Sequence, residues 1–90
     1  MSKILGLDYG EKRCGISITD DLRLIASPLD TINTNEIINY LVEIIARENI
    51  SILVIGEPKN NKNNFFEIEE SIKKLIKKIK LNIPDLIIER

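Results

Sequence analysis

The chain has 90 residues, enough for one small domain, and a formal net charge of -1. That charge gives no overall attraction to nucleic acid, so any such binding must come from a local patch. One cysteine, Cys14, and no histidine exclude an intrachain disulfide and the usual zinc ligand sets. No apolar run approaches the roughly 18 residues of a membrane helix and no signal peptide is recognisable, so we expect a cytoplasmic protein.

Two short strands open the chain, and the first ends in a carboxylate. Residues 3–9 are mainly apolar as far as Asp8, and Gly10 then lets the chain turn. Residues 14–19 alternate apolar with small or polar side chains, which is typical of a half-buried strand. The pattern predicts a hairpin with Asp8 at its turn end.

Asp8 has two interpretations. An Asp before Gly often opens a turn by accepting backbone hydrogen bonds, and that role needs no site. Alternatively, an ionised carboxylate at the edge of a core is costly unless it is paired or bound to a metal. Lys12 and Arg13 on the same hairpin tip would flank such a site with cations that attract phosphate. In a chain without histidine, oxygen ligands favour Mg²⁺ or Mn²⁺.

The remaining pattern predicts one more strand and then helices alternating with strands. Residues 24–29 complete an antiparallel meander. Asn33 and Glu36 have the spacing of a capping box. The predicted elements after that point are a helix over 37–48, a strand over 50–56, a helix over 65–79 and a strand over 86–89.

This order, βββαβαβ, predicts an α/β protein with a mixed five-stranded sheet of the ribonuclease H type. In such a sheet the first strand lies next to the fourth, so Asp8 and Gly56 come out at one edge. Glu89, at the end of a neighbouring parallel strand, joins them there. Two carboxylates from adjacent strand ends can then share a metal ion.

Three segments together resemble the YqgF family of Holliday junction resolvases, also described as pre-16S rRNA processing nucleases. They are Lys3–Asp20, Ile25–Leu29 and Val54–Pro58, and they occur in the family's order. The resemblance covers roughly the whole chain outside residues 59–81. It implies a ribonuclease H-like fold, a divalent metal such as Mg²⁺ or Mn²⁺, and hydrolysis of phosphodiester bonds in nucleic acid.

The candidate site residues form two groups. Asp8 and Glu89 are the candidate catalytic acids and metal ligands, the second because Glu89-Arg90 matches the end of the family's Asp-Glu-Arg motif. Ile88 stands in place of the first acid of that motif. The candidate substrate-binding residues are Lys12, Arg13, Gly56, Pro58 and Arg90.

The chain stops at Arg90, whereas the family continues through further helices that supply another metal-binding Asp. The resemblance therefore implies one ribonuclease H-like domain over residues 1–90 that lacks the C-terminal helices and is incomplete at its C-terminus. A further acid is needed to hold two ions about 4 Å apart for in-line hydrolysis, so we expect weak metal binding and poor catalysis. An uncovered sheet face would also favour association into a homodimer or low solubility.

Two further features have ordinary structural explanations. We interpret Glu57 as part of a turn in preference to a metal ligand, because the family more often has a non-acidic residue there.

The lysines of the second helix complement its negative end, and Glu69–Lys73 and Glu70–Lys74 have the spacing of helical ion pairs. No aromatic residues are interleaved for stacking on bases, so a solvated face is favoured over a nucleic-acid contact.

Three functions remain open at this point. The first is a nuclease acting on structured RNA, in 5′-end processing of pre-16S rRNA during ribosome biogenesis. The second is a resolvase of branched DNA on the same scaffold, because phosphate contacts carry no base information. The third is a catalytically inactive remnant or nucleic-acid-binding module, favoured by Ile88 and by the missing acid.

Overall fold

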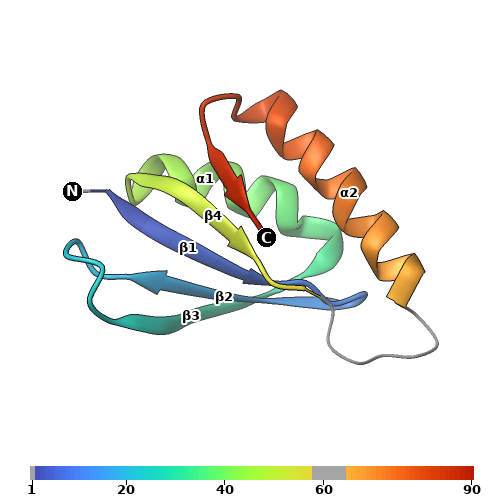
Figure 1. Ribbon diagram of the computed structural model, residues 1–90, viewed down its shortest axis with the longest axis horizontal. Helices are drawn as coiled ribbons and strands as arrows, with labels where there is room; N and C mark the ends of the chain where they lie inside the picture. Colours follow the sequence, from blue (N-terminus) through green and yellow to red (C-terminus); the bar gives the residue numbers. More distant parts are fainter. Residues whose placement is uncertain (1, 58–64) are drawn as a thin grey trace.

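The computed structural model describes residues 2–57 and 65–90 as a five-stranded sheet with two helices on one face (Figure 1). The strand order is β3-β2-β1-β4-β5, with β1 antiparallel to β2 and parallel to β4. This arrangement confirms the predicted α/β class. Among these residues no helix is long and apolar enough to cross a membrane. The elements are β1 (Lys3–Asp8), β2 (Arg13–Thr19), β3 (Ala26–Asn33), the 3₁₀ turn η1 (Thr34–Glu36), α1 (Ile37–Arg47), β4 (Ile50–Ile55), α2 (Phe65–Asn82) and β5 (Ile87–Glu89).

The core lies between the sheet and the two helices. Side chains alternate between the two faces of a strand, so every second residue of β1 and β4 points toward the helices. Leu5 and Leu53 are fully buried there, and Leu41 of α1 and Ile72 of α2 pack against the same cluster. Cys14 is also fully buried, as expected of a small core residue.

The first helix begins differently from the prediction. Asn33 makes no side-chain capping bond and the helix opens with a 3₁₀ turn, so the capping box expected of Asn33 and Glu36 is wrong. The Thr34 hydroxyl instead donates to the Gly10 carbonyl at 2.7 Å, which ties the helix start to the β1–β2 turn. At the other end Asn49 takes a φ of 55°, a left-handed conformation that ends the helix before β4.

The bounds of β3 also differ from the prediction. The strand was expected over 24–29 and runs from Ala26 to Asn33. The preceding turn is stabilised by the Leu24 amide, which donates to Asp20 Oδ1 at 2.8 Å, and Arg23 has a φ of 60°. Because β3 is an exposed edge strand, its sequence has little of the alternation by which a buried strand is recognised.

Candidate functional site

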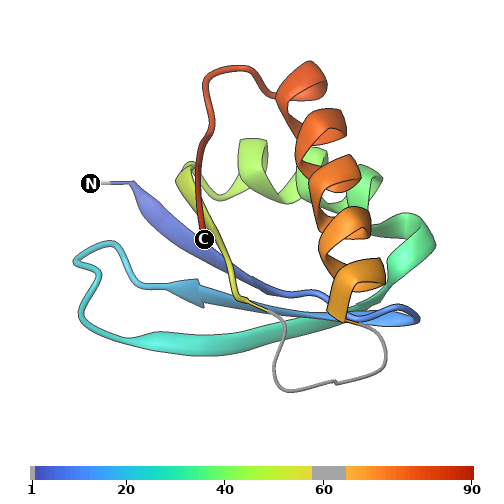
Figure 2. The same ribbon diagram turned by 45° about the vertical axis from the view of Figure 1, so that its right-hand side comes forward.

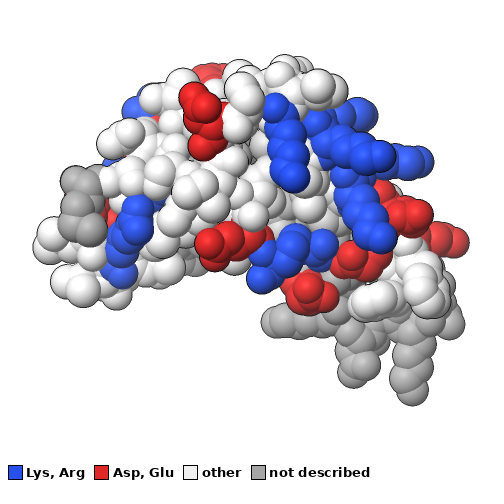
Figure 3. All heavy atoms as spheres, turned by 45° about the horizontal axis from the view of Figure 1, so that its top comes forward, with Lys and Arg blue, Asp and Glu red and all other residues white. Residues whose placement is uncertain are grey.

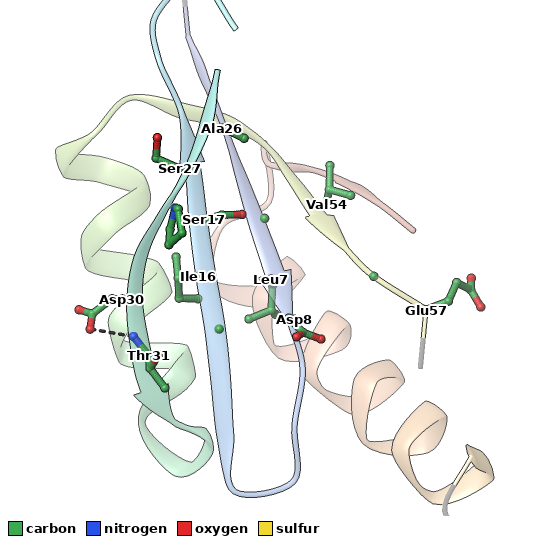
Figure 4. A pocket seen from close by; sticks show the side chains of 14 residues that line it. Leu7, Asp8, Ile16, Ser17, Ala26, Ser27, Asp30, Thr31, Val54 and Glu57 are labelled. Atoms are coloured by element: carbon green, nitrogen blue, oxygen red, sulfur yellow. Dashed lines mark hydrogen bonds between the residues drawn. The ribbon is translucent and has the colours of Figure 1, made fainter. Parts of the chain in front are cut away.

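The second face of the sheet is hollowed at its centre. Figure 2 shows α1 and α2 together on the opposite face, and no described helix packs on this one. A hollow of about 840 Å³, the sheet hollow, is lined in part by the small residues Gly6, Gly15, Ser17 and Ala26, and Figure 4 shows it from close by. A Cβ atom on Gly6 would lie 2.5 Å from Ser17 Oγ, so a larger residue on β1 would fill this space.

Asp8 lies at one end of the sheet hollow. It is the last residue of β1, opposite Gly15 of β2, and it is exposed. The cost of burying a carboxylate therefore does not apply to it, which corrects the reason first given for a site here. What supports a site is placement, because the end of β1 delivers the carboxylate to the rim of a hollow that small residues leave open.

Glu57 is the second acid at this rim. Leu7 pairs with Ile55, and the Gly56 amide donates to the Leu7 carbonyl at 3.1 Å, so β4 ends beside β1. Glu57 follows directly and lines the same hollow as Asp8. In Figure 4 the Asp8 carboxylate points toward the side of the sheet on which Glu57 lies. The sequence signal for Glu57 was its position right after a strand-ending glycine, which we had interpreted as a turn.

Glu89 lies farther from Asp8 than the sequence suggested. Its strand, β5, pairs with β4, and Glu89 is opposite Val54. The β1 neighbour of Val54 is Gly6, two residues before Asp8. The expectation that the two acids come from adjacent strands is therefore wrong, because β4 lies between them. Sheet spacings put their Cα atoms roughly 12 Å apart on the same face.

The candidate substrate-binding residues occupy different surroundings. Lys12 lies in the β1–β2 turn, and Arg13 begins β2 on the face that carries Asp8, two residues before Gly15; both cations are exposed. Gly56 lines the sheet hollow. Pro58 lies outside the described residues.

Arg90 is held against α2 and β4 at the protein surface by an ion pair. Its guanidinium donates to both carboxylate oxygens of Glu69, at 2.6 and 3.4 Å, and to the Ile55 carbonyl at 3.4 Å. This pair raises the pKa of Arg90 and lowers the pKa of Glu69. The contact fastens the residue after β5 to α2 and β4, and a substrate phosphate would compete with Glu69 for Arg90.

The ion pairs of α2 also differ from those expected. Glu69 is engaged by Arg90, so the predicted Glu69–Lys73 pair is wrong. Lys73 lies 3.8 Å from Glu70 instead, and no ion pair joins Glu70 to Lys74. Lys74 is therefore less compensated than the sequence suggested.

The acids at the rim have the right chemistry to bind a divalent metal, but there are few of them. Carboxylate oxygens are the ligands that Mg²⁺ and Mn²⁺ prefer. Within residues 2–57 and 65–90, however, no three His, Cys, Asp or Glu side chains gather closely enough to hold a metal ion. The rim of the sheet hollow thus offers two carboxylates, those of Asp8 and Glu57, to a cation.

Comparison with known proteins supports this interpretation of the fold. A "Putative pre-16S rRNA nuclease" of Karelsulcia muelleri is 51% identical over 90 residues, and one of Flavobacterium psychrophilum is 41% identical over 90 residues. The chain spans only 65% and 66% of the lengths of these two relatives. The structure of T. thermophilus RuvC in complex with a Holliday junction substrate matches with a TM-score of 0.63 at 15% identity, over 91% of this chain and 57% of that one.

The RuvC likeness shows the fold alone and confirms the ribonuclease H-like sheet. Family membership follows from a sequence model. The model of the RuvX family, described as Holliday junction resolvase, matches residues 2–89. That match covers nearly the whole chain and confirms the resemblance to the same family under its other name, YqgF. The chain belongs to the RuvX family.

Proposed function

We propose that this protein is a metal-dependent nuclease that hydrolyses phosphodiester bonds in structured RNA, in the 5′-end processing of pre-16S rRNA. One observation carries the proposal: the end of β1 delivers Asp8 to the rim of an open hollow where β4 also ends. The family model and the names of the relatives support the reaction class and the substrate. The chain works in the cytoplasm, where this RNA is processed.

Asp8 is the central acid of the proposed site. Glu57 is a candidate ligand because it shares the hollow with Asp8. Glu89, two strands away on the same face, is the other candidate acid. Asp8 and Glu57 would hold a Mg²⁺ or Mn²⁺ ion there, which would supply water activation and charge stabilisation for phosphodiester hydrolysis. Arg13, on the same face as Asp8, attracts the phosphate group by charge.

The remaining candidates serve the substrate more indirectly. Lys12 adds positive charge at the same turn, and Gly56 shapes the exit of β4 beside Asp8. Gly56 lets a backbone or phosphate approach closely because it has no side chain. Arg90 positions the end of β5, and contacts the substrate only if Glu69 releases it.

Cleavage assays test this proposal. Mn²⁺ is titrated into the chain and its Asp8→Asn, Glu57→Gln and Glu89→Gln variants, with a labelled structured RNA and a four-way DNA junction as substrates. Mutating a residue that only supports a metal ligand typically lowers activity about 10–100-fold. We therefore expect Asp8→Asn, which changes a proposed ligand itself, to lower the cleavage rate about 100-fold or more. Glu43→Gln, which removes an exposed acid of α1, is the matched control.

The outcomes separate the three functions. Asp8-dependent cleavage of RNA supports the proposal, and cleavage of the junction in preference to RNA favours the resolvase. Cleavage that survives Asp8→Asn contradicts the assignment of the site. Binding of either substrate without any cleavage identifies a nucleic-acid-binding module.

A homodimer is part of the same proposal. The turn between β2 and β3 exposes three large apolar side chains, Leu22, Leu24 and Ile25, at 65%, 77% and 64%. Adjacent apolar side chains of this size are a typical association surface. Light scattering over a range of concentrations should show dimers that Leu24→Ser weakens, and a monomer at every concentration would contradict this.

A further inference from the structure

A second hollow lies on the helix-covered side, between α1, α2 and the end of β1. Its volume is about 260 Å³, and we call it the helix hollow. Its apolar lining comes from Ile37, Ile38 and Leu75. Ligand pockets usually exceed about 300 Å³, so the helix hollow suits a compact group. Its polar lining consists of Tyr9, Thr34, Asn35, Ser71, Lys74 and Lys78.

Two lysines give the helix hollow its charge. Lys74 and Lys78 are four residues apart, so they lie on one face of α2. In the described part of the chain neither lysine forms an ion pair, since Glu70 pairs with Lys73 and Glu69 with Arg90. Figure 3 shows basic side chains gathered over α2. Like charges at this spacing repel each other, and an anion between them would relieve the repulsion.

Neutral donors accompany the lysines. Tyr9, Asn35 and Ser71 line the helix hollow, and their side chains make no hydrogen bond to any other group in the described ranges. A hydroxyl or a carboxamide can each donate to a phosphate oxygen. The Thr34 hydroxyl is already committed to the Gly10 carbonyl. Three unused neutral donors beside two cations form a set that matches a phosphate group.

The position of Tyr9 links this hollow to the proposed site. Asp8 lines the sheet hollow, whereas Tyr9, the next residue, packs against the core on the helix side. Consecutive residues at a strand end point to opposite faces. The two hollows therefore lie back to back across the end of β1. A nucleic-acid strand that passes Asp8 and rounds this end meets Lys74 and Lys78.

We propose that the helix hollow binds a backbone phosphate of the nucleic acid that is cleaved at the Asp8 rim of the sheet hollow. Lys74 and Lys78 neutralise the phosphate, and Tyr9, Asn35 and Ser71 orient it. This inference rests on the proposed function for the identity of the ligand, and it adds a contact on the opposite side of the sheet. It makes no distinction between RNA and DNA, because both present the same phosphate.

Equilibrium binding tests the inference separately from cleavage. Fluorescence anisotropy in EDTA measures the affinity of the full chain for a labelled RNA hairpin and a labelled four-way DNA junction. The test variant is Lys74→Gln/Lys78→Gln. The matched control, Lys77→Gln/Lys80→Gln, removes the same charge from α2 at positions that do not line the helix hollow. Circular dichroism shows whether each variant is folded.

We expect the test variant to lose affinity by about tenfold at moderate salt. The slope of log K against log salt should fall by about 0.9 for duplex DNA and about 0.7 for single strands, because one phosphate contact is lost. The control pair should change both quantities much less. Equal losses in the two variants, an unchanged affinity in the test variant, or no binding by the parent chain would each overturn the inference.

A neutral substitution separates directed binding from general attraction. Asn35→Ala changes no charge, so it should weaken binding by about threefold while leaving the salt slope unchanged. If cleavage depends on Asp8 but Lys74→Gln/Lys78→Gln binds normally, the phosphate site in the helix hollow is refuted and the nuclease function stands. If only Lys74→Gln/Lys78→Gln loses binding and neither the parent chain nor any variant cleaves, the nuclease function is refuted and the phosphate site stands.

Discussion

The two faces of the sheet differ in burial and side-chain size, although their residues alternate along the same strands. On the covered face, Leu5 and Leu53 are fully buried beneath the helices. On the other face, Gly6 and Ser17 leave the sheet hollow open. Branched aliphatic side chains supply burial free energy, whereas small residues supply none and leave room for a ligand. Stability and the candidate site are thus carried by alternate residues of β1, β2 and β4.

The largest expected effect is a cavity in the covered face. Leu53→Ala removes a fully buried side chain, and such a change costs about 2–5 kcal/mol. Val54→Ala, the adjacent residue of β4 on the other face, should cost less than about 1 kcal/mol because its side chain is only partly buried. Urea unfolding followed by circular dichroism measures both. Equal losses would show that the open face also contributes to the core.

The next effect distinguishes two glycines that follow strand ends, Gly10 after β1 and Gly56 after β4. A Cβ atom on Gly10 would meet the backbone carbonyl of Arg13, which cannot rotate away, so Gly10→Ala should cost about 1–3 kcal/mol. Gly56→Ala meets nothing within 4 Å and should change the free energy of unfolding by less than about 0.5 kcal/mol. Chemical denaturation of both variants tests this. Similar values for the two would contradict the tight hairpin turn.

The smallest expected effect concerns the ion pair that fastens β5. Arg90 lowers the pKa of Glu69 from its ordinary value of 4.5, so the unfolded chain binds more protons in acid than the folded one. The pair's contribution is therefore present above about pH 4.5 and is lost as the pH falls through the lowered pKa. Glu69→Gln should make stability less dependent on pH in this acid range.

A second variant tests whether Arg90 is the cause. Arg90→Met should flatten the same part of the pH profile, and the double variant should flatten it no further, because one interaction is removed in each case. Thermal unfolding from pH 3 to pH 7 provides the profiles. A pH dependence that survives in Arg90→Met would assign it to other carboxylates.

Local pattern determined the order and type of the elements. The helix predicted over 65–79 is present as α2, which buries Ile68, Ile72 and Ile79. The strand-end position of Asp8 and the neighbourhood of β1 and β4 also follow from the sequence. These features depend on periodicity and on the connection rules of α/β folds, both of which act within or between successive elements.

Only the tertiary structure decided which distant groups meet. Glu69 pairs with Arg90 across the fold, although Lys73 is nearer in sequence, and Glu89 is separated from Asp8 by the whole width of β4. Glu57 enters the site because β4 ends beside β1. Such contacts depend on strand register and on how the helices pack over the sheet. The chain as a whole sets both, and no local pattern of residues encodes them.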